Sequence, residues 1–289
     1  MTHGACLCGA VRFEVEPPYR WFAYCHCSMC RRQHGALFGA GLGVERASFK
    51  WLGGTDAIVP YRASASFERP FCRHCGSKVP AASHLPDVML VPAGTLDGDF
   101  DVKPRAHIFV GSKSPLCTIT DALPRFDAYP PGVDLPVVPG PAAGSSADGL
   151  TGSCLCGEIA YELRVEPRRI VHCHCSLCRR SRGGPFATTS FASCAHFEWT
   201  RGMDSIGTYR MQPPRSYGTD FCTSCGSLLP TVVPEADLVL IQAGALEAPL
   251  APLPGVHIYV GSKADWDDIT DALPEFDEMP PPERFAEYF

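Results

Sequence analysis

Short stretches of alternating apolar and polar side chains dominate this chain. Residues 10–15 and 158–165 show that alternation, which is typical of strands with one buried face. Short apolar runs between glycines and prolines predict further strands. In the first half these runs are residues 36–44, 58–62, 88–93 and 106–110, with counterparts in the second half. We therefore expect a mainly β fold of antiparallel strands.

Helical signals are confined to two short segments. Residues 28–33 and 176–181 predict short helices, and Ser28 and Ser176 stand where an N-cap is expected. Each half is therefore expected to combine strands, turns that carry cysteines, and a short helix.

The sequence pattern occurs twice along the chain. Cys6 has its counterpart 148 residues later, and Cys72 has its counterpart 150 residues later. Residues 129–149 are rich in Pro, Gly, Ala, Ser and Val and predict a linker. We therefore expect two tandem domains, residues 1–128 and 150–289, which pack together as an intramolecular pseudo-dimer.

The composition is that of a globular protein. Hydrophobic residues make up 45% of the 289 residues and charged residues 19%, enough for each half to bury a core. The formal net charge of -6, without a long basic block, argues against nucleic-acid binding. No apolar run reaches the ~18 residues of a membrane span. With Cys6 so near the start, we expect no secretory signal and predict a cytoplasmic location.

Sixteen cysteines give the strongest chemical signal in the sequence. Fourteen of them follow a pattern that occurs twice: Cys-x-Cys, Cys-His-Cys-x-x-Cys and Cys-x-x-Cys. In a reducing compartment such spacings more often bind a metal than form disulfides. Sites made only of thiolates favour zinc over magnesium or calcium, with iron as the alternative. We expect up to four zinc ions per chain.

The two outer cysteine pairs of each copy predict a closed zinc site. Four thiolates complete a tetrahedral coordination and leave no position for a substrate, so such a site stabilises the fold. The expected structural ligands are Cys6, Cys8, Cys72 and Cys75 in the first copy, and Cys154, Cys156, Cys222 and Cys225 in the second.

The central cysteine triplet of each copy predicts an open zinc site. Three thiolates leave a fourth position for water, a substrate or a neighbouring side chain. Alternatively, His26 or His174 closes the site, although adjacent residues on a strand point to opposite sides. The expected ligands of these two sites are Cys25, Cys27 and Cys30, and Cys173, Cys175 and Cys178.

The sequence says less about the roles of several other residues. His107 and His257 each open an apolar strand and are expected at a rim. Asp121 and Asp271 are expected to cap helices. Cys117 has no cysteine at the matching position of the other copy, so we expect an ordinary free thiol.

The cysteine motifs resemble those of the glutathione-dependent formaldehyde-activating enzyme family, which includes the centromere protein V relatives. The shared pattern is Gly-x-Cys-x-Cys-Gly, Cys-His-Cys-x-x-Cys-Arg and Cys-x-x-Cys-Gly-Ser. It stands at residues 4–9, 25–31 and 72–77, and again at residues 152–157, 173–179 and 222–227. The resemblance implies two β-tent domains, each with a structural zinc on the outer pairs and a catalytic zinc on the triplet.

The activity that the resemblance implies is that of a carbon-sulfur lyase. Such an enzyme joins glutathione, or another small thiol, to formaldehyde as S-(hydroxymethyl)glutathione, or splits that adduct. The alternatives are a non-catalytic zinc-stabilised binding module and a redox sensor based on the triplet thiols. The copies differ, because Tyr24 aligns with His172 and Cys117 with Asp267. The carboxylates of the thiol would need cations, and the candidates are Arg31, Arg32, Arg179 and Arg180.

Overall fold

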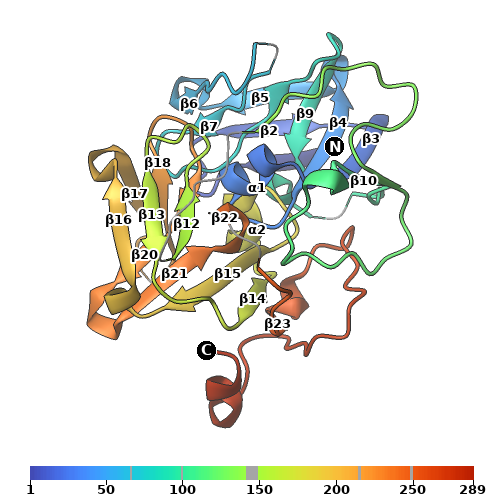
Figure 1. Cartoon of the computed structure of the whole chain (residues 1–289). Helices are drawn as coiled ribbons and strands as arrows, with labels where there is room; N and C mark the ends of the chain where they lie inside the picture. Colours follow the sequence, from blue (N-terminus) through green and yellow to red (C-terminus); the bar gives the residue numbers. More distant parts are fainter. Residues whose placement is uncertain (66, 99, 141–148, 214–215, 248–249) are drawn as a thin grey trace.

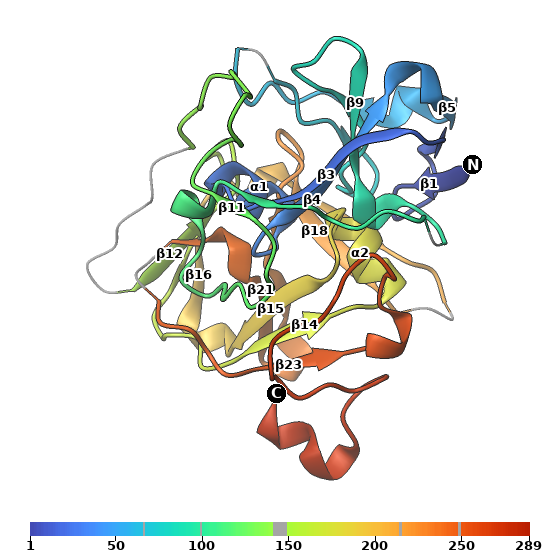
Figure 2. The same cartoon turned by 90° about the vertical axis from the view of Figure 1, so that its right-hand side faces the viewer.

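The two halves of the chain lie against each other in the computed structural model. The first half, blue to green, and the second half, yellow to red, meet around the helices α1 (Ser28–His34) and α2 (Ser176–Arg182) (Figures 1 and 2). Part of the predicted linker, residues 141–148, lies outside the described residues. The structure describes the whole chain except residues 66, 99, 141–148, 214–215 and 248–249.

Strands make up most of the regular structure of the first half, as predicted. The helix α1 (Ser28–His34) follows β3 directly. The strands are β1 (Thr2–Ala5), β2 (Arg12–Val15), β3 (Tyr19–Cys25), β4 (Gly39–Glu45), β5 (Phe49–Gly53), β6 (Ile58–Val59), β7 (Phe71–Cys72), β8 (Ala81–Ala82), β9 (Val88–Pro92), β10 (His107–Ile108) and β11 (Arg125–Phe126).

The second half repeats this order of elements. Its helix α2 (Ser176–Arg182) follows β14. The strands are β12 (Leu150–Ser153), β13 (Ala160–Leu163), β14 (Ile170–Cys173), β15 (Ala187–Ala192), β16 (Phe197–Arg201), β17 (Ile206–Arg210), β18 (Gly218–Cys222), β19 (Leu228–Leu229), β20 (Thr231–Val233), β21 (Leu238–Gln242), β22 (Leu246–Glu247) and β23 (Gly255–Ile258).

Each half contains one larger sheet. Its strand order is β11-β10-β3-β4-β9-β8 in the first half and β20-β21-β15-β14-β23 in the second. Smaller sheets have the orders β1-β2-β5, β16-β13-β12-β22, β17-β18-β19 and β6-β7. The mainly β fold is therefore confirmed. No helix among the described residues is long and apolar enough to cross a membrane.

The prediction of antiparallel strands is wrong at one edge of each larger sheet. There β10 runs parallel to both β3 and β11, and β23 runs parallel to β14. A parallel neighbour needs a long connection, and β4 to β9 supply one between β3 and β10. This pairing sets His107 opposite Tyr24, and His257 opposite His172.

The buried hydrophobic clusters draw side chains from both halves. Trp266 of the second half packs in one cluster with Phe22 and Leu42 of the first. The ring centroids of Phe22 and Trp266 lie 5.1 Å apart. A second cluster joins Leu37 of the first half to Ile241 of the second. Folding of either core therefore depends on side chains that the other half supplies.

The backbones of the two halves lie close together at two glycines, one in each half. Gly94 lies in the 3₁₀ helix η3 (Ala93–Thr95), which contacts α2. A Cβ atom added to Gly94 would overlap the carbonyl oxygen of Gly184. The second copy repeats this contact, because a Cβ atom on Gly244 would overlap the carbonyl oxygen of Ala36. Glycine is required at both places because backbone lies against backbone.

Replacing Gly94 by alanine should destabilise the chain by about 1–3 kcal/mol, the usual cost of overpacking a buried site. The matched control is Gly184→Ala, whose new Cβ would meet only Phe38 O, at 3.8 Å. Its counterpart in the first copy is already an alanine, Ala36. Thermal unfolding followed by circular dichroism checks both variants. Equal melting temperatures for the two variants would contradict this account of the contact.

A buried hydrogen bond between the halves has as its acceptor a carboxyl group whose pKa is raised. Tyr24 Oη donates to Asp267 Oδ1 at 2.6 Å. Asp267 is 4% exposed, and burial raises its pKa to about 7, against the opposing effect of the Tyr24 hydrogen bond. The folded chain therefore holds this proton more tightly than the unfolded chain does.

The stability of the folded chain should depend on pH through Asp267. Its contribution is complete below about pH 4 and is lost as the pH rises through about 7, a change of at most about 4 kcal/mol. Asp267→Asn should remove that part of the pH dependence, whereas Asp265→Asn, on the exposed part of the same loop, should retain it. Melting temperatures between about pH 5.5 and about pH 8 measure the difference. If all three proteins have the same pH profile, the buried carboxyl is not the source.

Candidate zinc centres

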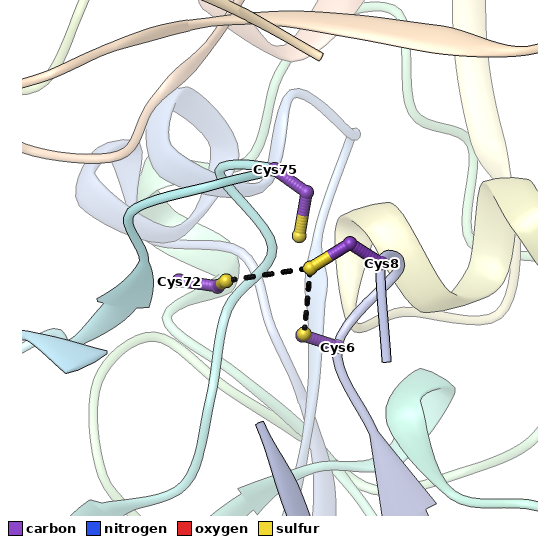
Figure 3. Close-up of side chains that lie close together, drawn as sticks. All are labelled: Cys6, Cys8, Cys72 and Cys75. Carbon is purple, nitrogen blue, oxygen red and sulfur yellow. Dashed lines mark hydrogen bonds between the residues drawn. The ribbon is translucent and has the colours of Figure 1, made fainter. Parts of the chain in front are cut away.

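Each quartet of outer cysteines is gathered into one cluster. The Sγ atoms of Cys6, Cys8, Cys72 and Cys75 lie within 4.8 Å of one another, and Figure 3 shows them converging from two separate segments. The Sγ atom of Cys8 is 3.4 Å from that of Cys6 and 3.7 Å from that of Cys72. Zinc with Zn–S bonds of about 2.3 Å holds its sulfurs roughly 3.8 Å apart. The quartet therefore fits tetrahedral zinc.

The second quartet has the same geometry and the same supporting contacts. Its Sγ atoms also lie within 4.8 Å of one another, with separations of 3.4 and 3.7 Å. The four cysteines are Cys154, Cys156, Cys222 and Cys225. All sixteen cysteines of the chain are free thiols.

Short-range donors support the sulfur atoms of each quartet. In the first half the backbone N–H of Val11 donates to Cys6 Sγ at 3.3 Å. Ser77 Oγ lies 3.3 Å from Cys75 Sγ and accepts a hydrogen bond from the N–H of Leu7 at 3.1 Å. The second half repeats these contacts with Ile159, Cys154, Ser227, Cys225 and Leu155. The serine of the Cys-x-x-Cys-Gly-Ser motif therefore ties both cysteine pairs together.

A buried lysine that was not predicted from the sequence connects the turns of the two quartets. Lys78 is 2% exposed, and its Nζ donates to the carbonyl oxygens of Gly76 and Gly226 at 2.7 and 2.5 Å. These glycines occupy matching places in the two Cys-x-x-Cys-Gly turns. Burial lowers the pKa of Lys78 to about 7. The position that matches Lys78 in the second copy is Leu228, so one lysine serves both turns.

Each central triplet is assembled within one turn of chain. The Sγ atoms of Cys25, Cys27 and Cys30 lie within 4.8 Å of one another. β3 ends at Cys25, and Cys27 is the N-cap of α1, with its Sγ accepting from the N–H of Cys30 at 3.3 Å. The prediction that Ser28 caps this helix is therefore wrong. The sulfur of the preceding cysteine takes that place, and it does so again in the second copy.

In the second copy Cys175 is the N-cap of α2, and its Sγ accepts from the N–H of Cys178 at 3.4 Å. Ser176 is therefore not the cap either. The Sγ atoms of Cys173, Cys175 and Cys178 also lie within 4.8 Å of one another. Three thiolates at the entry of a helix suit zinc and supply three of its four ligands.

The two triplets have different neighbours, which the sequence analysis missed. In the first half the Nη1 and Nη2 atoms of Arg69 lie 3.5 and 3.4 Å from Cys30 Sγ. Hydrogen bonds from Cys25 and Cys27, followed by the charge of Arg69, hold the pKa of Cys30 well below its usual range. In the second half no arginine takes this place among the described residues. There the phenol of Tyr217 lies 3.6 Å from Cys178 Sγ.

The histidine inside each triplet points to another histidine. His26 Nε2 lies 2.8 Å from His107 Nδ1, and His107 Nε2 lies 2.8 Å from Asp121 Oδ2. Burial, and then the neighbouring His107, lower the pKa of His26 to about 3, so its imidazole is neutral. The His26 ring is hydrogen-bonded to His107 and is not part of the cluster of sulfur atoms. This geometry favours an open site with three thiolate ligands over a site that His26 closes.

The second copy contains the same chain of hydrogen bonds. His174 Nε2 lies 2.8 Å from His257 Nδ1, and His257 Nε2 lies 3.1 Å from Asp271 Oδ2. Burial lowers the pKa of His174 to about 3.

The expectations for the outer members of these chains are wrong. His107 and His257 are buried, not rim residues. Asp121 and Asp271 cap no helix. Each accepts from the N–H two residues later, at Leu123 and Leu273, and holds a histidine. The sequence could not reveal the burial of His107 and His257, because each bonds to a histidine about eighty residues away along the chain.

The four arginines expected to contact a thiol ligand already bond to protein groups. Arg179 donates to the carbonyl oxygens of His174 and Ser262 within its own half. The other three reach across to the opposite half: Arg31 to Gly244 O, Arg32 to Glu247, and Arg180 to Asp97. Their role toward a ligand stays a prediction.

The quartets should matter more for folding than the triplets. A quartet joins segments more than sixty residues apart, whereas a triplet lies within one turn, so zinc in a quartet closes a much longer loop. Cys72→Ser should lose about one zinc ion and the tertiary structure of its half. Cys27→Ser should lose about one zinc ion and stay folded, because serine is itself a good N-cap.

Elemental analysis and near-ultraviolet circular dichroism of both variants check this. Equal unfolding of the two variants would refute the division of roles, and so would an unchanged zinc content.

The chain is mainly β, and each half carries one cysteine quartet and one cysteine triplet. These features are those of a protein with two tandem zinc-binding domains. The family model described as glutathione-dependent formaldehyde-activating enzyme matches residues 1–112 and 149–262. The chain therefore belongs to this family, in two copies, as the motifs predicted.

Individual relatives match one copy of the chain. A curated protein of Halomonas elongata, provisionally named a glutathione-dependent formaldehyde-activating enzyme, is 29% identical over 129 residues, which cover 39% of this chain and 77% of that protein. A crystal structure of a Rhodobacter sphaeroides protein is 27% identical, with a TM-score of 0.30, and the match covers 34% of this chain and 91% of that one.

Proposed function

We propose that this chain is a zinc-dependent carbon-sulfur lyase that forms or splits a small thiol-aldehyde adduct such as S-(hydroxymethyl)glutathione. The observation that carries the proposal is the triplet of sulfur atoms without a fourth cysteine or a histidine among the described residues of its cluster. Bound zinc would supply Lewis acidity and favour the ionised thiol of a substrate at its open position. Family membership supports this choice of reaction.

The residues of the chain would contribute position and charge. In the addition, the thiol sulfur bonds to the aldehyde carbon and the thiol proton passes to the aldehyde oxygen, and cleavage is the reverse. No oxidant or reductant is needed. Holding both reactants at one site can account for a large part of the acceleration. The turn that ends in α1, or in α2, fixes the three sulfurs before a substrate arrives.

Arg69 is our candidate for the cation that attracts an anionic thiol. Its guanidinium lies at the sulfur atoms of the first triplet and over the ring of Phe67, 5.3 Å from the centroid. Its Nε is buried without a partner in the described part of the chain. Glutathione carries carboxylates that such a group could bind. At the second triplet the uncharged Tyr217 takes this place, although the charge of Arg182 also acts on Cys178, so we expect the two halves to differ in affinity.

The contacts between the halves support the further proposal that they act as an intramolecular pseudo-dimer. Two copies share their hydrophobic clusters and a buried ion pair between Arg32 and Glu247. We further propose that the chain binds up to four zinc ions, acts on a small thiol and an aldehyde, and is located in the cytoplasm. The second candidate is a non-catalytic zinc-stabilised binding module.

Exchange spectroscopy with glutathione and formaldehyde tests the activity. The holoprotein should accelerate adduct formation and cleavage, Cys27→Ser or Cys175→Ser should each remove the share of one half, and the double variant should be inactive. Arg69→Met should weaken glutathione binding about tenfold, the effect of losing a charged hydrogen bond. Arg62→Met, at an exposed arginine in the same loop, is its control. Exchange rates equal to those without protein would exclude the lyase and leave the binding module.

A further inference from the structure

A cavity of about 410 Å³ opens between the two halves, apart from the zinc centres. None of the fourteen repeated cysteines is among its described lining residues. Its rim is exposed and includes Thr120 and Thr270, whose hydroxyl groups hydrogen-bond across the halves at 2.5 Å. Its buried floor consists of Tyr24, His107, Cys117, His172, His257 and Asp267. Volumes of this order are typical of small-molecule sites.

The charged groups that line the cavity all have one sign. They are the carboxylates of Asp121, Asp267, Asp268 and Asp271, and no lysine or arginine is among the described lining residues. Asp121 and Asp271 are bonded to histidines. Asp268 pairs at the surface with Lys103 at 2.7 Å. Of these four carboxylates, only Asp267 has a buried oxygen without a hydrogen-bond partner among the described residues.

Asp267 lines this space and has an acceptor that is not used. Its Oδ1 accepts from Tyr24, but its Oδ2 is buried and has no hydrogen-bond partner among the described residues. A buried acceptor without a donor costs about 1–3 kcal/mol, and more when it is charged. Native structures rarely keep such a group unless a ligand or water completes it. The matching residue of the first copy is Cys117, so the cavity has one such acceptor and is not symmetric.

The remaining walls are apolar and come from both halves. Leu37, Phe38 and Leu116 of the first half face Ile170 and Phe186 of the second around the same space. A ligand that satisfies the cavity therefore needs one hydrogen-bond-donating, positively charged end and a compact hydrocarbon body.

We propose that this cavity is a binding site for a small amphipathic primary amine, whose ammonium group bonds to Asp267 Oδ2 while its hydrocarbon part fills the apolar walls. An ammonium group offers three donors and neutralises a buried carboxylate. An anion would meet four carboxylates and no cation in the described lining. The site stands apart from the thiol-aldehyde chemistry proposed for the triplets and does not depend on it.

Calorimetric titration of the zinc-loaded chain near pH 8 with three ligands of matched shape tests the site. The ligands are benzylammonium chloride, benzyl alcohol and sodium benzoate. Benzylammonium should bind at least about tenfold more tightly than benzyl alcohol, because a charged hydrogen bond contributes roughly that much. Benzoate should not bind.

Two variants of the same loop locate the interaction. Asp267→Asn should weaken benzylammonium binding at least about tenfold and leave benzyl alcohol unchanged. Asp265→Asn, which is exposed and outside the lining, should bind all three ligands as the wild type does. If Asp267→Asn fails to fold, Asp267→Cys, which introduces the residue of the first copy, replaces it.

Equal affinity for amine and alcohol would overturn the proposal in favour of an apolar hole. Tighter binding of benzoate would overturn it in favour of an anion site, and no binding of any ligand would exclude a ligand site. The three-ligand comparison on the wild type decides between these results even without a variant. Glutathione-formaldehyde exchange, measured in parallel, reports on the triplets separately.

Discussion

The mutual repulsion of closely packed thiolates is the constraint on which this structure depends. Four sulfurs within 4.8 Å of one another can all be ionised only if a cation lies among them. The surrounding N–H and hydroxyl donors reduce that repulsion but do not remove it. Each quartet also fixes the turn before β2 against the turn after β7, or their counterparts in the second half. The cysteine cluster therefore determines how the sheets on either side of it are placed.

The two copies differ at several places where the halves meet and beside the triplets. Lys78 aligns with Leu228, and Cys117 aligns with Asp267. Arg69 lies beside the first triplet in the place that Tyr217 takes beside the second. The quartets and their serine contacts, by contrast, are the same in both copies. The cysteine quartets are thus kept in duplicate, while the residues beside the triplets and around the cavity differ.

The sequence predicted features that depend on neighbours along the chain. Cysteine spacing revealed both metal clusters because three or four ligands at fixed separations can meet only in a few ways. Strands such as β2 and β13 were visible because alternation follows from the pleat. The helix caps were missed because cysteine is not among the usual N-cap residues.

Other features depend on groups that are distant in sequence, and the sequence could not reveal them. The parallel direction of β10 follows from the path of the connecting chain. The burial of His107 follows from its partner His26. Arg69 lies in an irregular loop where no periodicity applies, and only the folded chain brings it to Cys30.

The single buried Lys78 has a consequence for the choice of partner. In a symmetric pair of two first halves, two ammonium groups would compete for the same two glycine carbonyls in a dry space, and their repulsion would oppose association. A pair of two second halves would have leucine at both places and leave those carbonyls without a donor. Either self-pairing is thus disfavoured relative to the mixed pair. The covalent link between the copies keeps one half of each kind together in every chain.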